Sequence, residues 1–235
     1  MLLGFVSTMN VFPNVDWLEI GHASIETLQM LGGSLFFTVV IGLPIGLALY
    51  LTLPGGLYGS RRVYSVLSFA VNVLRSLPFI ILLIVMIPFT LLLTGTSIGV
   101  PGAIPPLVVG VAPFFGRLVE NVLREIDREQ IEAAQTLGAT TWQIIARVIL
   151  PEALPGIVGA STVTSVALVS YTAMSGVIGG GGLGDLAVRY GYQRFETDVM
   201  VVTVLLMLVL VYGLQTLGDW VVNGLTRRTR RRALA

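Results

Sequence analysis

Residues 199–222 read VMVVTVLLMLVLVYGLQTLGDWVV, a stretch in which apolar residues greatly outnumber polar ones. A helix rises about 1.5 Å per residue, so this stretch would be about 36 Å long as a helix. The hydrocarbon core of a bilayer is about 30 Å thick, and about 20 apolar residues are enough to cross it. The stretch therefore predicts a transmembrane helix.

Four more apolar runs precede it along the chain. The chain is 54% hydrophobic and only 11% charged, whereas soluble domains are about 25% charged. We therefore expect an all-α integral membrane protein with five transmembrane helices, joined by polar loops that lipid could not solvate. The four earlier spans are expected at Leu28–Leu53, Val63–Leu93, Ile104–Leu123 and Gly156–Ile178.

The second run is longer than one span requires, and its strictly apolar part is Leu77–Leu93. Arg75 lies before that part, so it need not lie at the bilayer centre, where an arginine costs at least about 2.5–3.5 kcal/mol. Either Arg75 extends to the inner interface, or it faces an inward cavity and meets substrate or a partner helix. In the third run, Glu120 is a possible ion-pair partner for Arg117, three residues before it.

The arginines are distributed unequally between the two sides of the predicted spans. The opposite side of the membrane from the C-terminus holds only Arg189 and Arg194. Because cytoplasmic loops carry an excess of arginine and lysine, we expect the N-terminus outside and the C-terminus inside. The arginines on the inner side are Arg61, Arg62, Arg124, Arg128, Arg147, Arg227, Arg228, Arg230, Arg231 and Arg232.

These spans predict one transmembrane domain over residues 25–226, with a cytoplasmic loop at residues 125–155. Residues 1–24 would form an extracytoplasmic or interfacial segment, because they lack the basic region and the cleavage site of a signal peptide. Residues 227–235 would form a basic cytoplasmic tail.

Composition also limits the chemistry that this chain can perform. It contains no cysteine and one histidine, His22, so disulfides, cysteine-based zinc sites and thiol catalysis are excluded within it. We predict no catalytic residue, metal site or cofactor, and the net charge of +1 does not indicate nucleic-acid binding. All 14 basic residues are arginines, so a P-loop, which requires lysine, is excluded. Any ATP hydrolysis that drives this protein must therefore take place on another chain.

The predicted loop between the third and fourth spans has the pattern of two short helices. Residues 129–137 are good helix formers and end at Gly138, which suits the left-handed position after a helix. Thr140 or Thr141 can cap the next helix, and Pro151 would end it. We expect a compact helical hairpin that serves as a docking surface. The apolar residues expected on one face of its second helix are Trp142, Ile145, Val148 and Ile149.

The spacing of residues in this hairpin resembles the EAA loop of ABC importer permeases. Glu132-Ala133-Ala134 is followed after three residues by Gly138, and Val148 precedes Leu150-Pro151 by one residue. The family consensus has isoleucine at the position of Val148. The resemblance implies that the loop forms a coupling helix that fits a cleft on an ATPase subunit. The residues that it places in this contact are Glu132, Ala133, Ala134, Gly138, Leu150 and Pro151.

The chain beyond this loop resembles the methionine branch of these permeases. The element Gly181-Gly182-Leu183-Gly184 is similar to permeases for methionine and for glycine betaine, although the glycine run alone suggests a flexible connector. The segments that are closer to the methionine branch are Tyr171-Thr172-Ala173-Met174, Arg189-Tyr190-Gly191-Tyr192 and residues 75–82, 87–90 and 94–99. The resemblance covers nearly the whole chain from about residue 25.

The resemblance implies the type I ABC importer permease fold in a bacterial inner membrane. Two permease copies would form the pathway, two ATPase subunits would dock below, and a substrate-binding lipoprotein would deliver methionine from outside. Alternating access would follow from ATPase closure, and the permease itself would not be an enzyme. Tyr171 and Met174, with Arg75, would line the substrate path or its gate; alternatively, Tyr171 and Met174 simply pack in the helix bundle.

Two alternative functions follow from the same sequence. A permease of the same class could carry another small solute, such as glycine betaine. A secondary transporter is the other alternative, although such carriers often bury ionisable residues in mid-span and contain inverted repeats. The fourth run is rich in small and hydroxyl residues, which allow close helix approach. We therefore expect that helix to be central, either at an interface or along a polar path.

Overall fold

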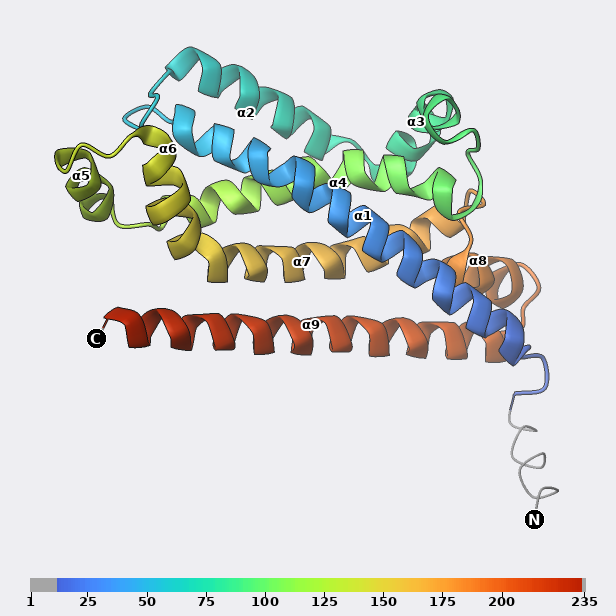
Figure 1. Ribbon diagram of the computed structural model, residues 1–235. Helices are drawn as coiled ribbons and strands as arrows, with labels where there is room; N and C mark the ends of the chain where they lie inside the picture. Colours follow the sequence, from blue (N-terminus) through green and yellow to red (C-terminus); the bar gives the residue numbers. More distant parts are fainter. Residues whose placement is uncertain (1–11, 234–235) are drawn as a thin grey trace. The chain divides into compact units, whose positions relative to one another are not determined.

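The computed structural model describes residues 12–233, with their side chains as far as Thr226 (Figure 1). These residues form helices and connecting loops, with no β-strand among them, so the all-α prediction is confirmed. The elements in chain order are α1 (Trp17–Thr52), α2 (Arg61–Ser76), α3 (Phe79–Thr94), α4 (Gly99–Arg124), α5 (Arg128–Thr136), α6 (Thr141–Ile144), the π-helical segment η2 (Ile145–Ile149), α7 (Leu150–Gly176), α8 (Gly182–Leu186), the π-helical segment η3 (Ala187–Tyr192) and α9 (Thr197–Ala233).

Within the described residues, four helices are long and apolar enough to cross a membrane. The number rises to five if the bent pair α2 and α3 counts as one span, as the sequence predicts. Helix α1 begins at Trp17, well before the predicted start of the first span at Leu28. The earlier start has a local cause, because the Asp16 carboxylate accepts hydrogen bonds from the backbone N–H groups of Leu18 and Glu19.

The second apolar run is not one helix, contrary to the continuous stretch that its composition predicts. Helix α2 ends at Ser76 and α3 begins at Phe79, with Leu77 and Pro78 between them. Pro78 lacks a backbone N–H and disfavours a helical conformation in the preceding residue, and Leu77 is extended with ψ of 130°. Pro44 and Pro88, by contrast, lie inside α1 and α3 without ending them.

Two compact units make up the chain, and α1, α4, α7 and α9 each contribute to both. The first unit contains the residues up to Ser34 together with Pro78–Leu107 and Ala167–Gly213. The second unit contains Leu35–Leu77, Val108–Val166 and the residues from Leu214 onward.

In the second unit, α1 and α4 make close contact at glycines. A Cβ atom at Gly42 would lie 2.8 Å from the carbonyl oxygen of Ala112, and one at Gly46 would lie 2.6 Å from that of Gly116. Glycines four residues apart permit such an approach between membrane helices. A buried apolar cluster extends from this contact into α5, α6 and α7, and includes Leu51, Phe115, Val119, Leu123, Ile131, Ile144, Ile145, Ile149 and Ile157.

In the first unit, the short helix α8 packs between residues of α1 and α9. Leu183 and Leu186 of α8 share a buried cluster with Ile20 and Ala23 of α1 and with Val199 of α9. The segment that follows the glycine run is therefore held in the interior of this unit.

Hydroxyl residues of α7 are buried in both units, as the small-residue pattern predicts. Thr164 and Ser165 are buried in the second unit, and Thr172 and Ser175 in the first. Each donates a hydrogen bond to a backbone carbonyl of α7 itself, at 2.7–2.8 Å. Satisfied in this way, these hydroxyls allow close packing without needing a polar neighbour.

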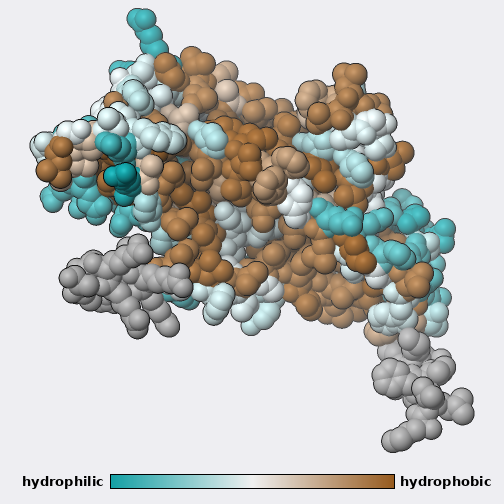
Figure 2. Space-filling model, viewed as in Figure 1, coloured by the Kyte–Doolittle hydropathy of each residue, from teal (hydrophilic) through white to brown (hydrophobic). Residues whose placement is uncertain are grey.

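Hydropathy separates the long helices from the short helices α5 and α8 on the visible face (Figure 2). Figure 2 shows hydrophobic residues over much of that face, and hydrophilic residues gathered over α5 in the second unit. Hydrophilic residues also gather around α8 in the first unit. The hairpin that contains α5 is therefore a polar extension of an apolar helical unit.

Candidate functional site

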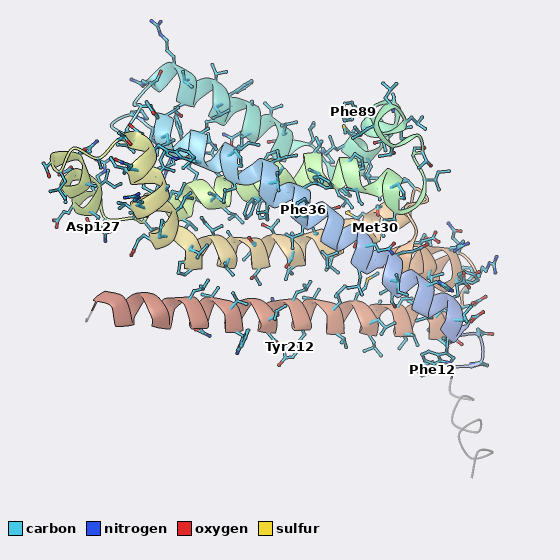
Figure 3. All side chains as sticks on the ribbon, viewed as in Figure 1. Phe12, Met30, Phe36, Phe89, Asp127 and Tyr212 are labelled. Carbon is cyan, nitrogen blue, oxygen red and sulfur yellow. The ribbon has the colours of Figure 1, made fainter. Side chains whose placement is uncertain are left out.

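The first helix of the hairpin is defined at both ends by local hydrogen bonds. The side chain of Asp127, labelled in Figure 3, accepts a hydrogen bond from the backbone N–H of Glu129 at 3.0 Å and so caps α5. After α5, Gly138 has φ of +78°, which confirms the predicted left-handed position. The turn is closed by bonds from the N–H of Gly138 to Gln135 and from that of Ala139 to Ala134.

The second helix of the hairpin begins with a reciprocal cap at Thr140. Its hydroxyl accepts from the backbone N–H of Gln143, and the Gln143 side chain accepts from the backbone N–H of Thr140. Two backbone donors that a helix start leaves unpaired are thereby satisfied. Of the two threonines that the sequence offers as caps, Thr140 is the one used.

Pro151 does not end this helix, contrary to the prediction. Helix α7 starts at Leu150 and continues through Pro151 to Gly176. The π-helical segment η2 directly precedes it, and such wide turns shift the hydrogen-bond pattern by one residue. The missing N–H of the proline and the bulk of its ring are thus accommodated where a regular α-helix would break.

The buried face of the second helix also differs from the apolar face that the spacing predicts. Ile144, Ile145 and Ile149 are buried, Val148 is half-buried, and Trp142 is exposed. The helix starts at Thr141, so Trp142 lies in its first turn, while the π-helical turn rotates later residues relative to regular helical spacing. Together with Ile131 of α5, the three isoleucines join the apolar cluster that includes Leu123 of α4.

The six predicted coupling residues divide into two groups. Glu132, Ala133, Gly138 and Pro151 are exposed, whereas Ala134 and Leu150 are half-buried against the apolar cluster. Sequence reasoning missed two exposed apolar side chains of the same hairpin, because it grouped Trp142 with the apolar face of the second helix and passed over Leu137. Leu137 is 88% exposed and Trp142 is 71% exposed. Exposed apolar groups beside small ones are typical of a protein–protein contact.

An ion-pair network lies in the same unit as the hairpin. Glu120 of α4 is fully buried, and it pairs with Arg117, as the spacing predicts, and with Arg124. The hydroxyl of Tyr64 on α2 donates to Glu120 at 3.1 Å and accepts from Arg124 at 2.8 Å. The sequence did not reveal the contribution of Tyr64, which is distant along the chain.

The three predicted path residues have different surroundings. In the first unit, the ring of Tyr171 stacks on that of Phe79 with centroids 4.5 Å apart, and Met174, one turn later, is exposed. In the second unit, Arg75 is exposed, and its guanidinium lies 5.7 Å from the centre of the Phe114 ring. Tyr171 therefore packs on one side, while Met174 presents a flexible apolar side chain.

The glycine run is an ordered element rather than a flexible connector. The carboxylate of Glu26 accepts from the backbone N–H of Gly182 at 2.7 Å, and the hydroxyl of Thr27 accepts from that of Leu183 at 2.9 Å. Gly181 and Gly182 have φ near +79° and +78°. Side chains of α1 thus cap the start of α8, which tertiary structure alone could reveal.

A charged group follows this capped segment. The Arg189 guanidinium pairs with Asp185 at 2.7 Å and lies 3.6 Å from Glu19. Partial burial raises the pKa of Asp185, Arg189 opposes that rise, and the carboxylates of Glu26 and Glu19 add to it. Within residues 12–233, no group of three or more His, Cys, Asp or Glu residues could hold a metal ion.

The fold and the hairpin define a class of membrane protein, and comparison with protein families agrees. Residues 29–231 match the family described as binding-protein-dependent transport system inner membrane component, and the chain belongs to this family. It is a membrane subunit of a transport system.

Two similar relatives are named as methionine permeases. The chain is 46% identical over 217 residues to the methionine import system permease protein MetP of Bacillus subtilis, covering 92% of this chain and 98% of MetP. It is 44% identical over 206 residues to the probable D-methionine transport system permease protein MetI of Vibrio cholerae, covering 88% and 92% respectively.

Two solved structures of ABC transporters share the fold of this chain. A chain of the MetNI methionine ABC transporter, in an inward-facing conformation, matches with a TM-score of 0.87 and 48% identity, covering 88% of this chain and 96% of that one. An amino acid ABC transporter crystallised with histidines matches with a TM-score of 0.71 at 20% identity, covering 89% and 99%, and so shares the fold.

Proposed function

We propose that this chain is the permease subunit of an ATP-driven methionine importer. The observation that carries the proposal is the capped hairpin, whose small residues Ala133 and Gly138 are exposed, as are its apolar residues Leu137 and Trp142. Relatives that cover nearly the whole chain are named as methionine permeases. The chain contains no lysine and so cannot form a P-loop. A partner subunit must therefore hydrolyse the ATP that drives import.

The hairpin must face the cytoplasm for this function, and the arginine distribution supports that orientation. The N-terminus is then outside, and the arginine-rich residues 227–235 follow the last span on the inner side. Residues 1–24 lead into the first span from the outside, although α1 already begins at Trp17. The hairpin, at residues 125–155, lies within reach of a cytoplasmic ATPase.

The rigidity of the hairpin explains how it could pass on a movement. Ile131 of α5 and Ile149 of η2 are packed in the same cluster as Leu123 of α4. An ATPase that displaces α5 therefore also displaces the packed ends of α4 and α7, because such a core does not deform freely. The small size of Ala133 lets a partner surface approach closely, and Glu132 offers it a charge.

The assembly in this proposal is a homodimer of permeases with two ATPase subunits. A substrate-binding lipoprotein on the outer side delivers methionine, and the permease alternates between outward and inward access without making or breaking bonds in the substrate. Met174, Tyr171 and Arg75 are candidates to line the path. Exposed Met174 is suited to contact a thioether substrate, because methionine side chains adapt to apolar surfaces.

The docking role is tested by changing the size of one exposed side chain. Ala133→Leu preserves helix propensity and meets solvent in the free chain, so the permease should fold normally. Bulk at this position should block close docking and lower co-purification of the ATPase subunit by about tenfold, which corresponds to about 1.4 kcal/mol. The matched control, Ala133→Ser, keeps the side chain small and should retain the ATPase. Equal recovery of ATPase with both variants would show that α5 does not lie in the interface with the ATPase subunit.

The substrate is tested in proteoliposomes that hold the complete complex. Radiolabelled methionine should accumulate in the presence of ATP and binding protein, whereas glycine betaine should not. Met174→Ala should reduce methionine uptake about fivefold if the side chain lines the path, a loss of about 1 kcal/mol in contact energy. Uptake of glycine betaine in place of methionine would identify a same-class permease for another solute. Unchanged uptake by the variant would assign Met174 to packing alone.

A further inference from the structure

We propose that Arg124 is a positioning residue for coupling, which exchanges its partner Glu120 for Glu132 when α5 is displaced. This inference rests on the proposed function and adds a specific side-chain step to it. It follows from three observations in the second unit: a carboxylate with two arginines, a difference in exposure between those arginines, and a cavity beside α5.

The first observation is that Glu120 has more cationic partners than it needs. Its side chain is fully buried, and each carboxylate oxygen meets a different guanidinium. Arg117 is also tied to α2, because it donates to the hydroxyl of Ser68 at 2.7 Å and to the amide oxygen of Asn72 at 3.0 Å. Arg117 alone therefore keeps Glu120 neutralised, as a buried carboxylate requires.

The second observation is that Arg124 is held less completely. The side chain of Arg124 is 43% exposed, compared with 16% for Arg117. Its guanidinium donates hydrogen bonds to the carboxylate of Glu120 and to the hydroxyl of Tyr64. A partly solvated arginine on a flexible stem can leave one carboxylate for another at small cost.

The third observation is a cavity of about 210 Å³ that Arg124 and Glu132 both line. Ile131 and Gln135 of α5 form part of its wall, together with Gly55 and Gly56 from the loop after α1. The space gives α5 room to approach α4, and it brings a second carboxylate within the surroundings of Arg124. Glu132 is exposed, so a new ion pair there requires little desolvation.

One competing cation lies in the same cavity. Arg128 lines it as well, and Arg128 precedes Glu132 by four residues on α5, a spacing that favours contact. Because Arg128 moves with α5, an Arg128–Glu132 pair would not change when α5 is displaced. Only a cation on a different helix, such as Arg124 of α4, can gain or lose an ion pair with Glu132 when α5 moves.

The exchange would reach α2 through Tyr64. The hydroxyl of Tyr64 bonds both Glu120 and Arg124, so departure of Arg124 removes one of the bonds that hold α2 to α4. Two arrangements of one side chain, each with a paired carboxylate, thus link the position of α5 to the hold on α2. A two-state element of this kind is the physical basis for coupling between sites.

The experiment is a double-mutant cycle in proteoliposomes that contain the complete complex. The measured quantity is methionine transported per ATP hydrolysed, which a purely structural role would not change. Arg124→Gln and Glu132→Gln should each lower this ratio about fivefold or more, and the double variant should be no worse than the more affected single variant. When Arg128→Gln is combined with Glu132→Gln, the fold-losses in this ratio of the two single variants should multiply, as expected for independent residues.

Two results would overturn the exchange. In the first, the fold-losses of Arg124→Gln and Glu132→Gln multiply in the double variant. In the second, the fold-losses of Arg128→Gln and Glu132→Gln do not multiply, which would pair Glu132 with Arg128 instead. If Arg124→Gln fails to assemble, the same cycle is run with Arg124→Lys and Glu132→Asp, which keep both charges but shorten the reach. A wild-type complex that does not couple ATP hydrolysis to methionine uptake would refute the proposed function, whereas a coupled wild type with a multiplying cycle would refute only the exchange.

Discussion

Two turns built around glycine, one in each unit, use that residue for different reasons. Gly138 in the hairpin has φ of +78°, and a Cβ atom there would meet nothing within 4 Å. In the run that leads to α8, Gly182 has the same φ of +78°, but a Cβ atom there would lie 2.6 Å from the hydroxyl of Thr27. Two residues further on, a Cβ atom at Gly184 would lie 2.4 Å from the Cα of Ala173.

The two turns differ in whether the space around the glycine, as well as its backbone conformation, excludes a side chain. The hairpin needs glycine only because its backbone is left-handed, and its surface remains open to a partner. The glycines at the start of α8 are needed for the same left-handed backbone at Gly182, and also because α1 and α7 occupy the positions where side chains would lie. The first turn is therefore built to be contacted, and the second to be enclosed.

The largest effect is expected from Gly184→Ala. Helix propensity alone favours alanine by about 1 kcal/mol, but the added methyl group would overlap the backbone of Ala173. Overpacking of this kind costs about 1–3 kcal/mol or more, so the variant should unfold at a markedly lower temperature in detergent. The control, Gly21→Ala, is also helical but has nothing within 4 Å, and it should be as stable as wild type or slightly more so. A stable Gly184→Ala protein would mean that the run is not enclosed.

A smaller effect is expected from Gly138→Ala. The methyl group meets nothing, so the cost is that of placing alanine in the left-handed region, about 1–2 kcal/mol. Gly138→Asn should cost less, since asparagine tolerates this conformation. Thermal unfolding of the three proteins provides the measurement. An asparagine variant as unstable as the alanine variant would show that something other than φ requires glycine here.

The smallest effect is expected from Asp185→Asn, and it depends on pH. The pKa of Asp185 is raised above its usual value of 3.8, mainly by burial. The folded chain therefore binds this proton more readily than the unfolded chain, so its contribution to stability is fully present below 3.8 and is lost as pH rises through the raised pKa. Wild type should gain stability relative to the variant as pH falls through this window. Parallel unfolding curves at all pH values would show that Arg189 cancels the effect of burial.

Much of the hairpin could be predicted from its sequence because its determinants are local. The cap at Thr140, the left-handed Gly138 and the helix at residues 128–136 each depend on residues within a few positions of one another. The exposure of Trp142 could not be predicted, because a π-helical turn changes the helical spacing on which the predicted face relied. The continuation of α7 through Pro151 has the same cause.

The sequence by itself determined that this chain is helical, that its helices cross a membrane, and that a polar hairpin interrupts them, since composition and local spacing are sufficient for these features. It also determined the ion pair between Arg117 and Glu120, which are neighbours on one helix turn.

Only the tertiary structure decided which distant residues complete each site. It joined Tyr64 of α2 to Glu120 of α4, and it placed Glu26 and Thr27 at the start of α8, more than 150 residues away along the chain. The physical reason is that hydrogen bonds and packing between remote segments depend on where helices meet in space, and the periodicity of one helix contains no information about its neighbours.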